Sequence, residues 1–321
     1  MNPCTRLVLF TAILATCRPL FAADRATMPG RQVKVAALAI GFGGDHAQKL
    51  KLALEHLETA GQHGVDIACL PEEFSGTAAE PLAGPTTKAI GELARKYKMY
   101  VACPIREQGA DGRQYNTAVL LDRTGSIAGS YRKVFVFWGE GVHPSKEGVP
   151  VFDTDFGRIA MLTCFDANFD ELWQEAERKG AELVLWPSAY GGGMPLNGYA
   201  MIHNYYVVAV GRGNMIDVFG KTIAGVEQPR AQQFIATLDL DITIVHRDFT
   251  GGKVDRLLRE HKGEVEKLPM GDMEGWYVLR AVKPGVQVRP LCKKYEIETL
   301  REYRGRSRQQ INQRRAAGQT V

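Results

Sequence analysis

Hydrophobic and polar positions alternate through the first 240 residues in a pattern that predicts strands and amphipathic helices in turn. A strand is expected over 32–40, and Asp45 then caps a helix whose apolar residues between 47 and 57 recur every three or four positions. The next strand ends at Pro71. The further expected elements are a helix at 85–97, a strand at 99–104, a hairpin of 115–121 with 126–131, a strand at 157–164, a helix with its apolar face at 169–176, and strands at 181–187, 205–210, 219–224 and 234–239.

Two segments of the chain repeat one pattern with an offset of 116 residues. Residues 64–73 and 180–189 align without a gap, and each has a glycine, an acidic residue, an apolar strand and a proline. Apolar strands need cover on both faces, so we expect an α/β fold of two β-α-β-type halves, with two packed sheets and helices outside. Each proline ends the pairing of its strand, so the residue that follows it is a natural site position.

The pattern weakens beyond residue 250. Helices are expected at 253–261 and 300–315, and the second is rich in arginine and poor in apolar residues. The chain has 321 residues, 45% of them hydrophobic, and no linker divides it. We therefore expect one main domain over residues 30–285 and a basic helical extension over 286–321.

The first 22 residues have the pattern of an export signal. Arg6 precedes an apolar run that ends at Cys17, and Leu20-Phe21-Ala22 resembles a cleavage site. The run of 11 residues is too short to span a bilayer, and we expect no transmembrane span in the mature chain. We expect an exported protein, periplasmic or secreted; a lipoprotein signal ending at Cys17 and a buried N-terminal helix stay open as alternatives.

Charge is unevenly distributed along the chain. The net charge is +4, of which the leader carries +2 and residues 301–321 carry +5, so the remaining chain has −3. Nucleic-acid binding by the main domain is therefore not expected. The arginine-rich helix at 300–315 fits a solvated face or an oligomer contact, with a membrane-surface or nucleic-acid contact as the alternative.

Four of the six cysteines lie beyond the leader: Cys69, Cys103, Cys164 and Cys292. Their spacing matches no zinc pattern and no CxxC motif. Cys69 and Cys103 lie within apolar runs and are expected to be buried. We expect no structural disulfide at Cys164, because a nucleophilic thiol must stay free.

Three polar residues stand where predicted strands end: Glu72, Lys133 and Cys164. Each alone also fits a turn, surface or packing role, but together a carboxylate, an ammonium and a thiol can attack an amide or a nitrile. A thiol with a pKa of about 8.5 needs a base, and Glu72 is the best candidate. Lys133 and the Phe165 amide can stabilise a developing oxyanion. His143, the nearest histidine, lies in a Gly/Pro-rich loop.

These residues resemble the carbon–nitrogen hydrolase (nitrilase) superfamily, whose members use a Glu–Lys–Cys triad. The resemblance spans roughly residues 32–245. It implies an αββα four-layer sandwich, a homodimer or larger homo-oligomer, a small-molecule substrate, and no metal or organic cofactor. The motifs that carry it are Leu70-Pro71-Glu72, Tyr115-Asn116-Thr117, Tyr131-Arg132-Lys133, Thr163-Cys164-Phe165-Asp166 and Leu185-Trp186-Pro187-Ser188.

The resemblance also implies a role for each position of the triad. Glu72 takes the proton of Cys164, the sulfur attacks, Lys133 and the Phe165 amide hold the oxyanion, and Glu72 then activates the water that hydrolyses the thioester. Many members have a second glutamate shortly after the lysine. Glu140 is our candidate for it, and Glu147 or another solvated loop acid is the alternative.

The residues after the cysteine indicate the branch of the superfamily. Cys164-Phe165-Asp166 resembles the amide and N-carbamoyl hydrolases more than the nitrilases, which favours release of ammonia or an amine. Asn168 stands where several carbamoyl hydrolases have an arginine. Asn168 is expected to contact substrate, as are Ser188 and Tyr190 in the loop 188–195. A nitrilase proper and a catalytically silent binding scaffold on the same fold stay open as alternatives.

Overall fold

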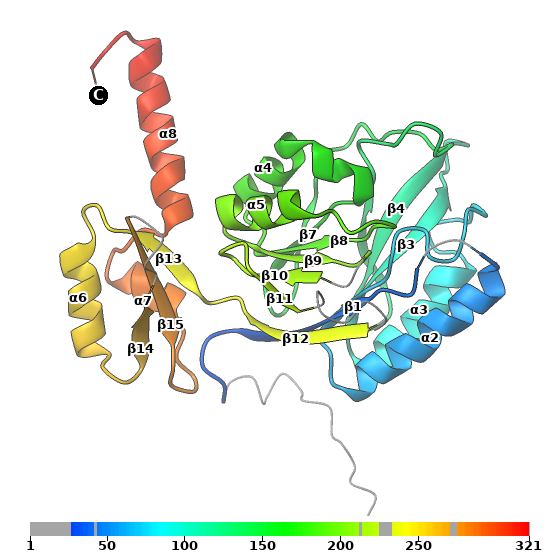
Figure 1. Cartoon of the computed structure of the whole chain (residues 1–321), viewed down its shortest axis with the longest axis horizontal. Helices are drawn as coiled ribbons and strands as arrows, with labels where there is room; N and C mark the ends of the chain where they lie inside the picture. The colour runs from blue at the N-terminus through cyan, green and yellow to red at the C-terminus, as the bar shows by residue number, and fades with distance from the viewer. Residues whose placement is uncertain (1–26, 42–43, 212–213, 225–232, 270–274, 321) are drawn as a thin grey trace, which may run out of the picture.

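The computed structural model describes residues 27–41, 44–211, 214–224, 233–269 and 275–320. The expected leader and its possible lipidation site lie outside these residues. Two six-stranded sheets face each other, and a pair of helices covers the outer face of each sheet (Figure 1). The expected α/β sandwich of four layers is thus confirmed.

The first sheet carries helices α2 and α3 and is built mainly from the first half of the chain. Its two parallel pairs join β1 to β2 and β2 to β3, and its other pairs are antiparallel. In sheet order its strands are β12 (Gln233–Asp239), β1 (Gln32–Leu38), β2 (Ile67–Cys69), β3 (Tyr100–Gln108), β4 (Gln114–Leu121) and β5 (Ile127–Arg132), and its helices are α2 (His46–Gln62) and α3 (Pro85–Tyr97).

The second sheet repeats this order, which confirms the two similar halves. Strands β7, β8 and β9 are parallel, as β1, β2 and β3 are, and β10 and β11 follow them as an antiparallel pair. Its elements are β6 (Val151–Asp153), β7 (Arg158–Met161), β8 (Leu183–Trp186), β9 (Tyr206–Ala209), β10 (Asn214–Ile216) and β11 (Thr222–Ala224), with the 3₁₀ helix η1 (Cys164–Asn168), α4 (Asp170–Arg178) and α5 (Met194–His203) outside.

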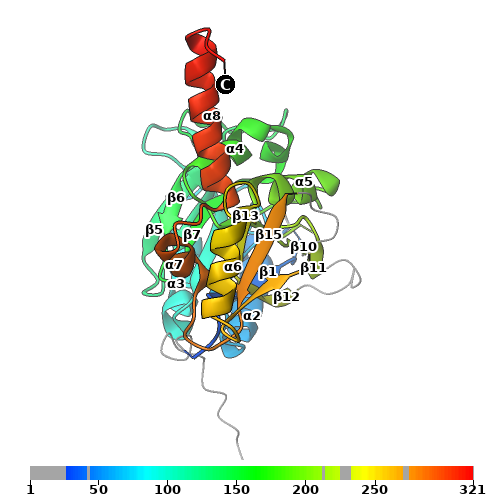
Figure 2. The ribbon, with the colours of Figure 1, turned by 90° about the vertical axis from the view of Figure 1, so that its left-hand side faces the viewer.

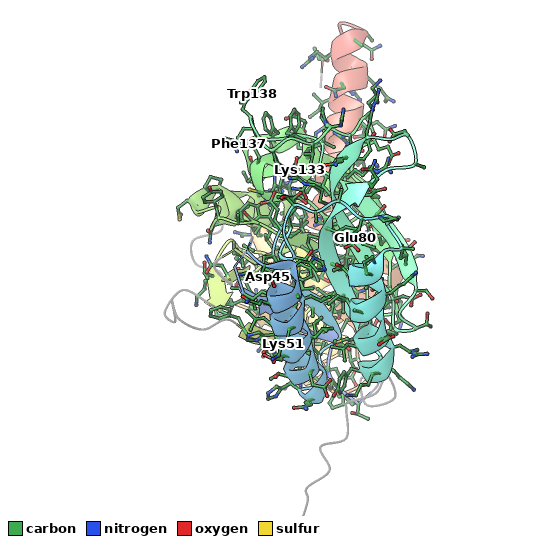
Figure 3. The ribbon with its side chains drawn as sticks, turned by 90° about the vertical axis from the view of Figure 1, so that its right-hand side faces the viewer. Asp45, Lys51, Glu80, Lys133, Phe137 and Trp138 are labelled. Atoms are coloured by element: carbon green, nitrogen blue, oxygen red, sulfur yellow. The ribbon has the colours of Figure 1, made fainter. Side chains whose placement is uncertain are left out.

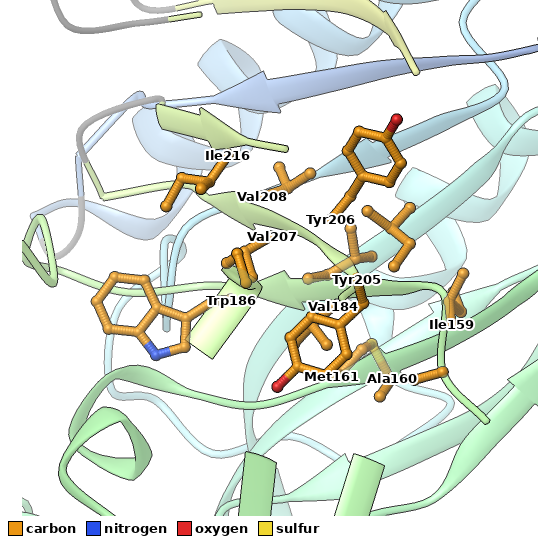
Figure 4. Packing of buried hydrophobic residues seen from close by; sticks show 14 of the residues in the cluster. Ile159, Ala160, Met161, Val184, Trp186, Tyr205, Tyr206, Val207, Val208 and Ile216 are labelled. Atoms are coloured by element: carbon orange, nitrogen blue, oxygen red, sulfur yellow. The ribbon is translucent and has the colours of Figure 1, made fainter. Parts of the chain in front are cut away.

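Strand alternation divides the core into two hydrophobic clusters. On β1, Val33 and Val35 point between the sheets, while Ala36 and Leu38 point toward α2 and α3. The cluster between the sheets continues beneath α4 and α5 and includes the fully buried strand β8 (Figure 4). Side chains that fill both faces of a strand hold the carboxyl ends of the parallel strands in fixed positions.

A third, smaller sheet follows the sandwich and packs on α6 and α7 around its own cluster from Val245 to Ile297 (Figure 2). The helix expected at 253–261 is α6, but the sheet itself is missing from the sequence prediction. Helix α8 leaves this region and projects beyond the body (Figures 1 and 2). The elements are β13 (Thr243–His246), α6 (Gly251–Glu260), β14 (Val265–Leu268), β15 (Trp276–Ala281), α7 (Val288–Lys294) and α8 (Leu300–Ala316).

Several short elements differ from the sequence prediction. The strand expected at 219–224 covers only β11, because the Gly220 amide donates to Asp217 O in a tight turn. Helix α5 starts within the Gly-Gly-Gly-Met-Pro run, where a loop was expected, and η1 separates Cys164 from α4. Within the described residues, no helix is both long enough and apolar enough to cross a lipid bilayer.

Candidate active site

Glu72 lies just beyond the end of β2, where Pro71 has ended the strand, and it is 7% exposed. Its Oε1 accepts hydrogen bonds from Lys133 Nζ at 2.8 Å and from Asn116 Nδ2 at 2.9 Å. Its Oε2 accepts from the Ala189 amide at 3.2 Å. Ala189 follows β8, so this carboxylate connects the ends of matching strands from the two sheets.

Lys133 follows the last residue of β5 and is 1% exposed. Its amide donates to Asn116 O at 2.9 Å, which fixes the backbone beside β4. Its Nζ also contacts Glu140 Oε2 at 2.9 Å. Burial acts to lower the pKa of Lys133, but the carboxylates of Glu72 and Glu140 outweigh it and raise the pKa above the usual value. The ammonium is therefore charged throughout the neutral range.

Glu140 lies in the loop between β5 and β6, and its carboxylate is held from three directions. Besides Lys133, it accepts hydrogen bonds from Asn116 Nδ2 at 2.6 Å and from the Phe137 amide at 3.0 Å. Lys133 thus lies between two carboxylates that Asn116 bridges. An ammonium has three donors, and here they face Glu72 Oε1 at 2.8 Å and the Glu140 oxygens Oε1 and Oε2 at 3.1 and 2.9 Å.

Cys164 is the first residue of η1 and comes from the other sheet, just after β7. Its φ of 44° lies in the left-handed region, which costs a non-glycine residue about 1–3 kcal/mol. Two hydrogen bonds to the end of β8 hold it there: the Cys164 amide donates to Pro187 O at 3.0 Å, and Trp186 Nε1 donates to Cys164 O at 3.2 Å. The strained turn lifts the sulfur away from the strand.

The thiol of Cys164 meets both Glu72 and Ser188. Burial raises its pKa to about 12, the negative charge of Glu72 adds to the rise, and the Ser188 hydroxyl and Lys133 act against it. The thiol is therefore protonated at neutral pH. Attack by the sulfur must be accompanied by proton transfer, and the Glu72 carboxylate is the base placed to receive the proton.

Asp166 holds the turn that carries the nucleophile. It is fully buried and accepts hydrogen bonds from the Thr163 amide and the Tyr131 hydroxyl, both at 2.8 Å, and from the Phe135 amide at 3.0 Å. Burial raises the pKa of Asp166 to about 7, against the effect of these donors. The bonds tie the start of η1 to β5, and so tie the cysteine to the segment that carries the lysine.

The Phe165 amide, second in η1, has no acceptor among the described residues, so it is free to donate to an oxyanion. The Phe165 ring packs edge-on against the ring of Phe137, with centroids 5.4 Å apart. Phe137 and Trp138 lie above Lys133 at the rim of the sandwich (Figure 3), where Trp138 is 89% exposed. Aromatic rings therefore lie at the rim of the sandwich above the buried charged residues.

The structure brings together Glu72, Lys133, Glu140, Cys164 and Ser188, with the Phe165 amide beside the sulfur. It does not bring the other residues expected from the sequence into this cluster. Asn168 is exposed and its Nδ2 donates to Phe165 O. The Tyr190 amide donates to Ser188 Oγ, while its side chain is 70% exposed. Glu147 is exposed, and the His143 ring lies beside Gln114 O.

Three supporting groups were not predicted as site residues: Asn116, Asp166 and a buried ion pair of Arg106 with Glu73. Arg106 Nε donates to Glu73 Oε1 at 2.8 Å, and Arg106 Nη2 donates to Glu140 O at 3.0 Å, which fixes the Glu140 backbone. Asn116 and Asp166 stood within recognised motifs. Nothing in the local sequence of Arg106 indicates that it reaches the loop of Glu140.

Comparison with known proteins gives a family match over most of the sandwich. Residues 34–243 match the family model described as carbon-nitrogen hydrolase. The β-ureidopropionase of Arabidopsis thaliana is 32% identical over 187 residues, which are 49% of this chain and 45% of that protein. The deaminated glutathione amidase of Rattus norvegicus is 28% identical over 211 residues, 58% of this chain and 64% of that protein. The chain thus spans about half the length of such relatives.

Solved structures share the fold. Nit3 of Saccharomyces cerevisiae, a member of branch 10 of the nitrilase superfamily, superposes with a TM-score of 0.58 at 23% identity, over 65% of this chain and 90% of that one. An amidase from Nesterenkonia sp. superposes with a TM-score of 0.57 at 20% identity, over 73% of this chain and 98% of that one. The family match and the shared fold together place the chain in the carbon–nitrogen hydrolase family of the nitrilase superfamily.

Proposed function

We propose that this protein hydrolyses a linear amide or N-carbamoyl C–N bond through a thioester on Cys164. The observation that carries the proposal is the buried cluster of Glu72, Lys133 and Glu140 on one sheet, which meets the thiol of Cys164 from the other. A base, a fixed positive charge and a nucleophile are the three groups that acyl transfer to sulfur requires.

Acylation follows from the protonation states of the cluster. The sulfur of Cys164 attacks the carbonyl carbon while Glu72 takes the thiol proton, so that no free thiolate accumulates. The carbonyl oxygen becomes negative and is stabilised by Lys133 Nζ and the Phe165 amide. Glu72 then gives the proton to the leaving nitrogen, the C–N bond breaks, and ammonia or an amine departs, leaving the acyl group on sulfur.

Deacylation uses the same groups a second time. Glu72 takes a proton from water, the resulting hydroxide attacks the thioester carbon, and the same two donors hold the oxygen. The C–S bond breaks and the proton returns to sulfur, which regenerates the thiol. Glu140 holds Lys133 in place through both half-reactions, because both of its carboxylate oxygens contact Nζ, at 3.1 and 2.9 Å.

Similarity to amide-cleaving relatives supports amide over nitrile cleavage. The matched relatives include a β-ureidopropionase and several deaminated glutathione amidases, and Cys164-Phe165-Asp166 agrees with that branch. Tyr190, which lies beyond β8, and Asn168, the last residue of η1, stay proposed substrate contacts.

The test is release of ammonia or amine from matched panels of linear amides, N-carbamoyl compounds and nitriles. The wild type should act on an amide or N-carbamoyl compound, and Cys164→Ala should not, with unchanged circular dichroism. Single-turnover reaction of the wild type should add the acyl mass to the peptide that contains Cys164. Equal background from both proteins would refute the hydrolase proposal, and turnover of nitriles alone would refute the choice of bond.

We also infer that the protein self-associates. The outward residues Met194, Met201 and Ile202 of α5 are 79%, 37% and 53% exposed, a cluster of apolar side chains that contact with a second copy would cover. Light scattering of the wild type should give a mass of at least twice that of the chain, and Ile202→Glu should reduce it. A monomeric wild type would contradict this inference.

For the first 22 residues we propose export, on the pattern of Arg6, the apolar run and Leu20-Phe21-Ala22. Expression of the full chain in a bacterial host, followed by fractionation and N-terminal sequencing, tests it. A processed chain in the periplasm or medium is the expected result. An unprocessed chain in the cytosol would contradict export.

A further inference from the structure

A cleft of about 910 Å³ lies where α8 meets the sandwich, at the N-terminal ends of β7 and β8. We name it the arginine cleft, because three arginines of α8 and four from the rest of the chain line it. The active site lies at the opposite ends of the same strands. Arg158 and Cys164 are six positions apart, up to roughly 20 Å of extended chain, and neither Cys164 nor Glu72 lines the cleft, so this cleft is a separate site.

Arginines reach the cleft from two sides. Arg301, Arg304 and Arg308 are spaced by three and four residues, which places them on one face of α8. Arg178, at the end of α4, lines the cleft from the sandwich. Two walls of a recess, rather than one flat surface, therefore present guanidinium groups.

The carboxylates of the cleft are already engaged. Glu182 pairs with Arg31 and Arg289, Glu177 contacts His203 Nδ1 at 2.6 Å, and Glu302 Oε2 accepts from the Thr299 amide at 2.8 Å. These contacts account for three of the four acids that line the cleft. The fourth, Asp155, pairs with Arg123 at 3.0 Å.

Four arginines of the cleft have no carboxylate partner within the described residues: Arg178, Arg301, Arg304 and Arg308. Arg301 and Arg304 donate to backbone carbonyls that face them, including Asn204 O at 2.9 Å and Ile202 O at 2.6 Å. The side chains of Arg178 and Arg308 make no hydrogen bond to any described residue. The cleft thus holds positive charge that the protein itself does not neutralise.

The arginines of the cleft also act on one another electrostatically. Burial lowers the pKa of Arg301 to about 10 against the effect of the Glu177 carboxylate, and the nearby Arg289 charge acts in the same direction as burial. Burial also lowers the pKa of Arg304 against the effect of Glu177, and Arg308, one turn along the helix, adds to the lowering. A bound anion would relieve this repulsion, since guanidinium groups pair with phosphate oxygens through two parallel hydrogen bonds.

We propose that the arginine cleft is a binding site for a diphosphate group, either free or part of a small molecule. Unpaired guanidinium groups on two facing walls match the several negative charges of such a group. The cleft volume lies within the range of small-molecule sites, about 300–1,000 Å³. A membrane would instead require the arginines to share one outward face.

Isothermal titration of the full-length protein with inorganic pyrophosphate, at constant ionic strength, tests the proposal. We expect saturable binding of one pyrophosphate per chain, and at least tenfold weaker binding of inorganic monophosphate. Arg178→Gln combined with Arg308→Gln should weaken pyrophosphate binding at least tenfold, because both side chains are exposed and free to donate. The matched control is Arg314→Gln with Arg315→Gln, which removes the same charge from the same helix beyond the cleft and should leave binding unchanged.

Titration with ADP distinguishes the two sources of the group. Tighter binding of ADP than of pyrophosphate, with the same sensitivity to the cleft variant, assigns the site to a nucleoside diphosphate; equal or weaker binding assigns it to the free anion. Absence of saturable pyrophosphate binding, or an equal loss in the control variant, would overturn the proposal. So would sedimentation with anionic phosphatidylglycerol vesicles that pyrophosphate does not reverse. Unchanged melting of both variants verifies that they are folded.

Discussion

At the scale of single residues, the proposed chemistry depends on a lysine between two carboxylates and a thiol that keeps its proton. Lys133 is almost completely buried, and its charge is compensated by Glu72 and Glu140 together. In the proposed reaction Glu72 loses and regains its negative charge, so Glu140 is the partner that holds the ammonium throughout. The two glutamates are therefore not interchangeable.

Replacement of Glu140 by glutamine should lower kcat roughly 100-fold with little change in KM, because the amide keeps the shape of the side chain but no longer anchors Lys133 electrostatically. Steady-state kinetics on the best amide substrate measures this. Glu147→Gln is the matched control, since Glu147 lies in the same loop and is exposed. Equal losses in the two variants would argue against a specific role for Glu140.

The pKa of the Cys164 thiol, and with it the reactivity of the sulfur at a given pH, should depend on the charge of Glu72. The thiol pKa is raised to about 12 by burial and then by the Glu72 charge, so removal of that charge in Glu72→Gln should lower the pKa. At pH 8 the variant should then react faster than the wild type with 2,2′-dithiodipyridine, with Cys164→Ala as the background. A slower reaction in the variant would contradict this coupling.

At the scale of elements, the turn after β7 decides where the nucleophile stands. The expected strand through 157–164 stops at Met161, and a 3₁₀ turn held by Asp166 carries the cysteine in a left-handed conformation. The sequence motif Thr163-Cys164-Phe165-Asp166 indicated the candidate nucleophile but not this geometry. Of the three donors to Asp166, only the Thr163 amide belongs to the turn; the Tyr131 hydroxyl and the Phe135 amide come from β5 of the other sheet and from the segment after it.

Asp166→Asn should lower the free energy of unfolding by about 1–3 kcal/mol, because the NH2 group that replaces one carboxylate oxygen cannot accept a hydrogen bond and leaves a buried donor unsatisfied. It should also lower kcat, since Cys164 and the Phe165 amide lose their fixed positions. Urea denaturation and kinetics measure the two effects. The control Asp255→Asn, at an exposed position of α6, should change stability by less than about 0.5 kcal/mol. An Asp166→Asn protein of wild-type stability and rate would show that the turn keeps its conformation without the Asp166 carboxylate.

The long elements and the repeat between the halves could be predicted from sequence, and the short or non-local ones could not. Helices α2, α3 and α8 and the hairpin of β4 with β5 have clear periodicity and turn signals. Strands β6, β10 and β13 have three or four residues each, too few to show a period. In the site, the motifs indicated Glu72, Lys133 and Cys164. Arg106 donates to the backbone of Glu140, 34 residues away in the sequence, and no local pattern indicates such a contact.

At the scale of the whole molecule, α8 joins the third sheet to the sandwich. Its first turn is anchored by Arg301, whose guanidinium donates to His203 O, Ala181 O and Asn204 O at 2.7, 2.6 and 2.9 Å. The remainder of the helix, from Arg308 onward, is exposed. The helix expected from sequence to be a solvated face or an oligomer contact thus has an anchored first turn and a free end.

Arg301→Ala should lower the free energy of unfolding by at least about 1.5 kcal/mol, since it leaves three carbonyls without their donor. Amide hydrogen exchange should accelerate in α8 and in the strand that precedes it, β15, and less in the sandwich. Arg306→Ala is the control, because its pair with Glu298 is exposed and exposed pairs contribute little to stability. Identical exchange in the two variants would exclude an anchoring role for Arg301.

The proposed catalytic groups are divided between the two sheets, so the proposed reaction should be sensitive to how the sheets pack on each other. Glu72 and Lys133 belong to the first sheet and Cys164 to the second, so a small shift of one sheet against the other would separate the proposed base from the proposed nucleophile while every strand kept its pairing. Mild heating or low denaturant should then abolish hydrolysis before far-ultraviolet circular dichroism changes. Substitutions of buried residues between the two sheets, far from any substrate, should lower the rate of hydrolysis as the loss of a proposed catalytic residue would.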